Sequence, residues 1–208
     1  TERPARISAW LSRVTEIQAM ATFPVGALIF IGAPTLLEVW LGPVLERSSG
    51  LLESTSLVTR LVMIQMMIRA LADGWLRVFY GLGLVERYAR LVTLSGVVQP
   101  IIIVAAAGIW GQVLVMPAVV LVAVTALFQM FFIPLRLERA HPGFLSEIRT
   151  SLRWPLGATL VAAPVLLPLW NPKDVCELIL WGGGYLVLIF GLLFRRFNKI
   201  RGPLSTGD

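Results

Sequence analysis

The sequence is poor in charged residues and in the residues that most often bind metals or act as nucleophiles. Charged residues make up only 14% of its 208 residues, and it has one cysteine and one histidine. With a single cysteine, Cys176, the chain cannot form an internal disulfide or a cysteine-rich zinc site, and we expect Cys176 to behave as a small buried apolar residue. We expect His141, next to Pro142, to lie in a solvated loop rather than to act as a ligand or base.

Catalytic constellations are also missing from the hydrophobic part of the sequence. Its long apolar runs contain no paired carboxylates, no HExxH motif and no Ser–His–Asp set. An enzyme that works within a membrane needs some such group of residues. We therefore expect that the protein is not an enzyme and that it uses no cofactor or bound metal.

What the sequence has in abundance is apolar residues arranged in long runs. Hydrophobic residues make up 57% of the chain, which is too many for an ordinary soluble domain. A helix needs about 20 apolar residues to cross the hydrocarbon core of a bilayer. Six stretches reach or approach this length and predict an all-α, polytopic integral membrane bundle of about six transmembrane helices. They are residues 19–41, 51–80, 91–109, 113–134, 154–170 and 176–194.

The basic residues are distributed unevenly between the breaks that separate these runs. Fourteen of the 18 lie at every second break, whereas the alternate breaks carry only Arg47 and Lys173 among several acidic residues. Short loops rich in Lys and Arg stay in the cytoplasm during insertion, so we predict that both termini are cytoplasmic. We interpret the net charge of +6 as a topology signal and expect no nucleic-acid partner. The fourteen residues are Arg3, Arg6, Arg13, Arg77, Arg87, Arg90, Arg136, Arg139, Arg149, Arg153, Arg195, Arg196, Lys199 and Arg201.

The second hydrophobic run contains a polar face. It consists of residues spaced four apart, which share one side of a helix: Gln65, Arg69, Asp73 and Arg77. Arg60 projects from nearly the opposite side. An arginine at bilayer depth costs at least ~2.5 kcal/mol on insertion scales, so such groups should face a cavity or a partner. Two interpretations stay open. Asp73 forms a structural pair with an arginine, or the face is a cationic cavity wall that binds an anionic headgroup such as phosphate or pyrophosphate.

Prolines and one polar connection divide the chain further. Pro24 and Pro34 lie in the first run, and prolines inside a spanning helix remove a hydrogen bond and bend it. Pro100 and Pro117 lie in the third and fourth runs. The longest polar connection mixes apolar and charged residues, and we expect it to lie in the inner membrane interface. We divide the chain into a four-helix part (1–134), an amphipathic cytoplasmic linker (135–153) and a C-terminal helix pair with a basic tail (154–208).

Several short motifs resemble those of a known family. They are Pro24 followed by Glu38-Val-Trp-Leu-Gly42, then Arg69-Ala-Leu-Ala72, Gly81-Leu-Gly83 and Gly108-Ile-Trp-Gly111. Over roughly residues 15–135, this order is similar to the C-terminal half of polysaccharide biosynthesis flippases in the multidrug/oligosaccharidyl-lipid/polysaccharide exporter superfamily. The chain departs from the family pattern after Gly111, where Gln-Val-Leu-Val-Met-Pro replaces a run of small residues.

The resemblance implies a membrane transporter in the bacterial inner membrane. Such a flippase moves a polyprenyl-diphosphate-linked oligosaccharide across that membrane for polysaccharide biosynthesis. By resemblance, Arg69 meets the diphosphate, Asp73 orients or balances it, Gln65 contacts the sugar, and Arg60 is a weaker candidate. The first four runs would be the ninth to twelfth helices of a longer transporter, whose missing N-terminal lobe is one partner. The other expected partners are membrane lipid and the anionic lipid-linked glycan.

Two other functions stay open. A cation-coupled multidrug exporter of the same superfamily would depend on Asp73 and be indifferent to Arg69. A membrane scaffold that transports nothing would hold Arg69 and Asp73 in a closed pair with no cavity beside them.

Overall fold

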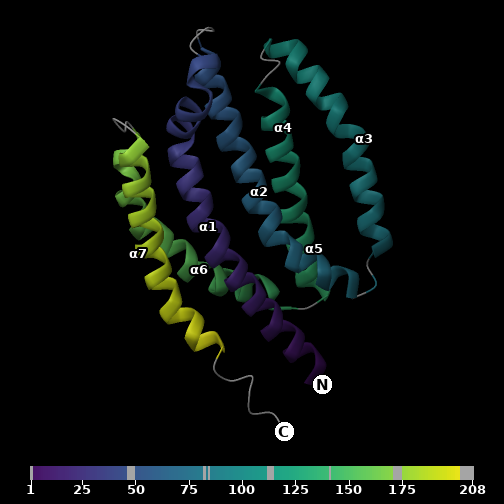
Figure 1. The fold of residues 1–208 in the computed structure, drawn as a ribbon. Helices are drawn as coiled ribbons and strands as arrows, with labels where there is room; N and C mark the ends of the chain where they lie inside the picture. The colour runs from purple at the N-terminus through teal and green to yellow at the C-terminus, as the bar shows by residue number, and fades with distance from the viewer. Residues whose placement is uncertain are drawn as a thin grey trace.

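The computed structural model describes residues 2–45, 50–81, 83, 85–111, 115–140, 142–170 and 175–201. Within these ranges the chain is helical apart from short turns, which confirms the all-α prediction (Figure 1). His141 and the predicted turn at 171–174 lie outside the described residues. The elements in chain order are α1 (Glu2–Leu45), α2 (Leu51–Gly81), α3 (Val85–Trp110), α4 (Met116–Thr125), the π-helix η1 (Ala126–Phe132), α5 (Ile133–Ala140), α6 (Phe144–Ala162), the 3-10 helix η2 (Ala163–Trp170) and α7 (Val175–Arg201).

Six helical segments are long and apolar enough to cross a membrane, as the sequence predicts. The fourth combines α4, η1 and α5, and the fifth combines α6 with most of η2. The protein is therefore a polytopic integral membrane protein. The six segments are Trp10–Gly42, Leu51–Val78, Tyr88–Ile109, Met116–Ala140, Phe144–Leu167 and Ile179–Asn198.

The two ends of the chain lie on the same side of the fold. The beginning of α1 and the end of α7 are found at the lower end in Figure 1, together with the end of α2 and the α5–α6 corner. These are the parts of the chain that carry the clustered basic residues. We assign this end to the cytoplasm on the positive-inside rule and refer to it as the inner end, and to the opposite one as the outer end.

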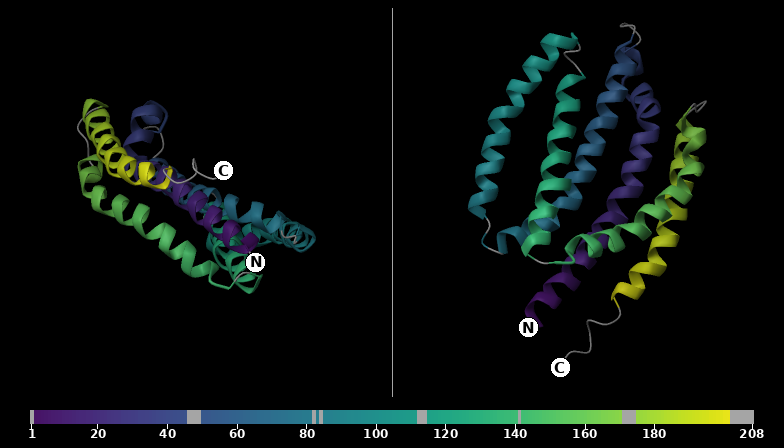
Figure 2. Two further views of the ribbon diagram at one scale, coloured as in Figure 1. Left: turned by 90° about the horizontal axis from the view of Figure 1, so that it is seen from below. Right: turned by 180° about the vertical axis from the view of Figure 1, so that it is seen from behind.

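The helices form a flattened layer rather than a round bundle. Seen from below, α3 lies at one edge of the layer and α7 lies at the other, and α6 runs from α5 along one face of the layer toward α7 (Figure 2). The long helix α1 occupies the middle, where it packs against α2, α6, η2 and α7, whereas α3 packs against α4. A layer of this kind leaves much apolar surface uncovered by the chain itself, which suits helices that are surrounded by lipid or by further helices.

One hydrophobic cluster joins α1, α2, α5 and α6 near the inner end. Trp75 is almost completely buried at its centre, with 1% of its surface exposed. Its indole Nε1–H donates to Thr15 Oγ1 at 3.0 Å, and its ring meets Phe144 edge to face at 6.4 Å. Gly74 lets α1 approach closely, because a Cβ there would lie 3.0 Å from Gln18 Oε1.

A second cluster joins α1, the α6–η2 segment and α7. It is formed by buried apolar residues that include Met20 of α1, Leu166 of η2, and Tyr185 and Ile189 of α7. At its inner edge, Arg196 Nε donates to Glu16 Oε1 at 2.8 Å, so an ion pair links the C-terminal helix to the first helix.

The segment predicted as an amphipathic linker is helical and partly buried. Glu138 turns the corner between α5 and α6, where its two carboxylate oxygens accept the backbone N–H groups of Gly143 at 2.9 Å and Leu145 at 2.7 Å. This satisfies donors that the start of a helix leaves free. Leu137 and Ile148 pack into the first cluster. The apolar side of the segment therefore contacts the protein core, and its charged side stays exposed.

Two further expectations concern single residues in helices. Cys176 is exposed, so the expectation of a buried cysteine is wrong. It lies in the first turn of α7, well before the residues of that helix that pack in the second cluster. The first run, with Pro24 and Pro34, is one continuous helix that bends in its outer part (Figures 1 and 2).

Candidate functional site

The polar face of α2 is split between the interior and the surface. Gln65 is buried, with 5% of its surface exposed, whereas Arg69, Asp73 and Arg77 are exposed. The reason is geometric, because each step of four residues turns about 40° further around a helix of 3.6 residues per turn. The side chain predicted to contact sugar, Gln65, therefore lies inside the packed helices, away from the exposed charges.

Asp73 is paired with Arg77. The Arg77 guanidinium donates to Asp73 Oδ2, with Nη2 at 2.9 Å and Nε at 3.1 Å. Both side chains are more than half exposed. An exposed pair one helical turn apart contributes little to stability. The pair matters for the site because Asp73, the carboxylate of this face, is bound to Arg77.

Arg69 is left as a surplus positive charge within a membrane-spanning segment. Among the described residues it has no ion pair or hydrogen bond to its side chain. It lies about 14 Å before the inner end of its span at Val78, counting 1.5 Å per residue. The ring of Tyr80, near the inner end of α2, meets that of Tyr88 in α3 edge to face at 5.8 Å.

Arg60 is bound within the chain. Its Nε donates to the backbone carbonyl of Phe30 in α1 at 3.0 Å, and its guanidinium lies 5.6 Å from the centre of the Phe30 ring. It is nine residues from Arg69, toward the outer end of α2. The structure thus brings Arg69, Asp73 and Arg77 together and places Arg60 and Gln65 elsewhere.

A groove at the other edge of the layer was not anticipated from the sequence. It lies between α6 and α7 and has a volume of about 410 Å³. Its floor includes Gly157 and Ala158, and Arg153 and Thr150 lie at its inner end. The sequence signal for this groove is the pair of small residues Gly157 and Ala158, which leave this part of α6 without large side chains.

Among the described residues, no three His, Cys, Asp or Glu side chains lie close enough together to hold a metal ion.

Comparisons with protein-family models, with curated proteins and with solved structures find no match to this chain.

Proposed function

We propose that this protein is part of a flippase that carries a lipid-linked oligosaccharide, with a polyprenyl diphosphate as its lipid anchor, across the bacterial inner membrane. The single observation that carries the proposal is the surplus guanidinium of Arg69. A fork of N–H donors matches the oxygens of a phosphate or diphosphate. An anionic headgroup beside α2 would supply the counter-charge that the described residues do not.

The exposure of Arg69 also supports a partner lobe. A charged group inside a membrane span normally faces other helices or a water-filled cavity rather than lipid. This face of α2 is accessible, because Arg69, Asp73 and Arg77 are all exposed. A second lobe of the same transporter, placed against it, would enclose a cavity with Arg69 on its wall.

The two other functions receive less support from the geometry. A scaffold would hold Arg69 and Asp73 as a closed pair, but Asp73 is bound to Arg77. A cation-coupled exporter needs a carboxylate that binds and releases the coupling ion. The carboxylate of Asp73 is already engaged with a guanidinium, and no described feature favours its release.

Transport of the glycan by the whole protein tests the proposal. In cells, Arg69→Ala should leave the amount of protein in the membrane unchanged but lower the surface glycan about 10- to 100-fold, which corresponds to the loss of one or two charge-assisted hydrogen bonds. Arg69→Lys should retain part of the activity, because it keeps the charge and loses the planar fork.

The matched control is Arg77→Ala, which removes a guanidinium from the same face. It should leave export nearly normal if the only function of Arg77 is its exposed pair with Asp73. Equal losses for Arg69→Ala and Arg77→Ala would contradict a specific headgroup contact. Loss of export in Asp73→Asn, with Arg69→Ala active, would favour the cation-coupled exporter.

A further inference from the structure

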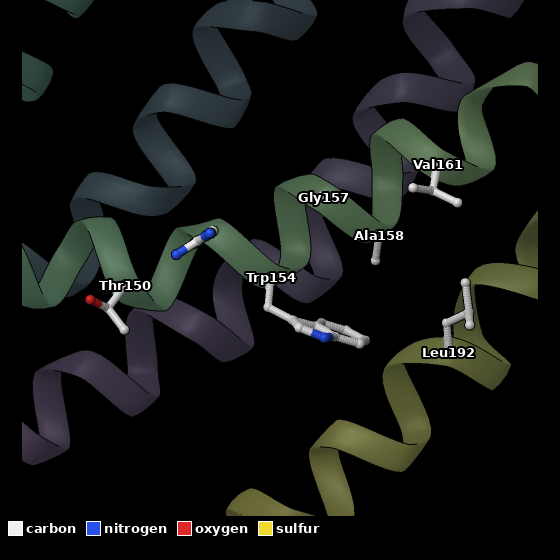
Figure 3. A pocket seen from close by; sticks show the side chains of 7 residues that line it. Thr150, Trp154, Gly157, Ala158, Val161 and Leu192 are labelled. Carbon is white, nitrogen blue, oxygen red and sulfur yellow. The ribbon is translucent and has the colours of Figure 1, made fainter.

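The groove between α6 and α7 has a hollow that the chain does not fill. Trp154 projects from α6 toward α7, and Leu192 projects from α7 toward α6, on either side of it (Figure 3). Between them α6 has Gly157 and Ala158, and a Cβ placed on Gly157 would meet no atom within 4 Å. At about 410 Å³, the groove falls within the range of small-molecule sites, which is about 300 to 1,000 Å³.

The groove is apolar along its length and basic at its inner end. Arg153 is part of its wall, and Arg149 lies one turn before it on α6. Arg195 follows Leu192 by three residues, so it lies on the same side of α7. All three arginines are exposed. No ion pair to a described residue neutralises any of them.

The nearest carboxylates do not cancel this charge. Glu16 is engaged with Arg196. Glu147 is two residues from Arg149, and side chains two apart project from opposite sides of a helix. The inner end of the groove therefore has a positive surplus, and Trp154 beside it is of the residue type that prefers the membrane interface.

We propose that this groove binds an anionic glycerophospholipid of the inner leaflet. The phosphate lies against the Arg153 guanidinium, and the acyl chains follow the apolar wall past Gly157 and Val161 toward the outer end. Two features of the groove favour a lipid. The apolar walls belong to helices that span the membrane, and the three exposed arginines give the mouth a positive charge, opposite to that of the headgroup. The inference does not depend on the proposed function, because the groove is lined by α6 and α7, whereas Arg69 lies on α2.

Lipid binding to the purified protein tests the site. Native mass spectrometry in detergent, with phosphatidylglycerol or phosphatidylcholine added in increasing amounts, measures the affinity for each lipid. We expect the wild type to prefer phosphatidylglycerol. Arg153→Gln should weaken phosphatidylglycerol binding about fivefold and leave phosphatidylcholine binding nearly unchanged, since one basic residue near an anionic surface contributes about that factor.

A second variant tests the apolar part of the groove. Gly157→Leu places a side chain in the hollow, where a Cβ meets no atom within 4 Å, so the protein should fold, and the binding of both lipids should fall. Gly96→Leu on α3 is its control, because a Cβ there also meets nothing within 4 Å and lies far from the groove. Arg90→Gln, on the same helix, is the control for charge.

The proposal is overturned by any of four results. Binding of phosphatidylglycerol could be unchanged in both groove variants, or reduced equally in the two control variants. The groove could instead be closed by a second copy, in which case the wild type would be a dimer and Gly157→Leu a monomer. Finally, a polyprenyl phosphate that competes with phosphatidylglycerol and binds more tightly, with the same dependence on Arg153, would identify the transported lipid as the occupant.

Discussion

Arg60 Nε donates a hydrogen bond to the carbonyl oxygen of Phe30, the one carbonyl of α1 that Pro34 leaves without its helical donor. In an α-helix the N–H of residue 34 would bond to the carbonyl of residue 30. Proline has no N–H, so the second helix supplies the donor across the interface. The charge of Arg60 is thus used to stabilise the proline-containing part of α1, and its guanidinium also lies over the Phe30 ring.

This relationship predicts a coupling between positions 60 and 34. Arg60→Ala should lower the free energy of unfolding in detergent by about 1 kcal/mol, the size of interhelical hydrogen bonds in membrane proteins. In a Pro34→Ala background, the Phe30 carbonyl regains its helical donor, so Arg60→Ala should cost clearly less. A double-mutant cycle measures the difference. Equal costs of Arg60→Ala in the two backgrounds would show that the arginine acts in some other way.

The ion pair between Glu16 and Arg196 predicts an asymmetry between its two partners. The Glu16 side chain is 9% exposed and that of Arg196 is 43% exposed. Arg196→Ala would leave a buried carboxylate without its partner, and we expect a loss of about 3 kcal/mol in the free energy of unfolding. Glu16→Ala leaves the arginine free to reach water, so its cost should be below about 1 kcal/mol.

The exposed pair of Glu86 and Arg90 is the control for that experiment. Their side chains are 80% and 79% exposed, and the distance between Arg90 Nη2 and Glu86 Oε1 is 2.7 Å. Removing either residue should leave the unfolding curve unchanged. If Arg196→Ala were as mild as Arg90→Ala, the pair between α1 and α7 would not hold the two helices together.

The buried hydrogen bond from Trp75 to Thr15 predicts different losses of stability for two substitutions of Thr15. Thr15→Val keeps the shape but removes the acceptor, which leaves the indole N–H unpaired in the core and should cost about 1 to 3 kcal/mol. Thr15→Ser keeps the hydroxyl and should cost less. Thermal unfolding of the variants measures both effects. A Thr15→Val protein as stable as the wild type would mean that the indole finds another acceptor.

The number of spans could be predicted from the sequence, whereas the side-chain contacts of Asp73 and Arg60 could not. The lengths of the apolar runs predict six spans, and the rotation of about 100° per residue explains why Gln65 turns inward while Arg77 stays exposed. Asp73 lies one turn from both Arg69 and Arg77, so sequence spacing alone could not choose between them. The contact of Arg60 with Phe30 depends on how α1 packs on α2, although Pro34 marks in advance which carbonyl needs a donor.

The inner segment 135–153 illustrates the same limit. Its mixture of apolar and charged residues predicts an amphipathic linker in the inner interface, but does not predict that its apolar side packs on protein. That outcome depends on the corner at Glu138, which places Phe144 against Trp75. Tertiary contacts between residues 69 positions apart in the chain have no signature in local periodicity.

Membrane orientation gives the last prediction. Cys176 is exposed and would react with thiol reagents, so the experiment begins from a Cys176→Ser protein. From the sequence, Gly111 is one possible position for a cysteine at the outer end, but its φ of 68° favours glycine. Glu53, exposed in the first turn of α2, is therefore the better position. A cysteine at Glu53 should react with a membrane-impermeant thiol reagent in intact cells, and one at Ser146, which is exposed at the inner end, should react only after the membrane is opened. Labelling of Ser146→Cys in intact cells, with Glu53→Cys protected, would invert the assigned orientation and place the arginine-rich end outside.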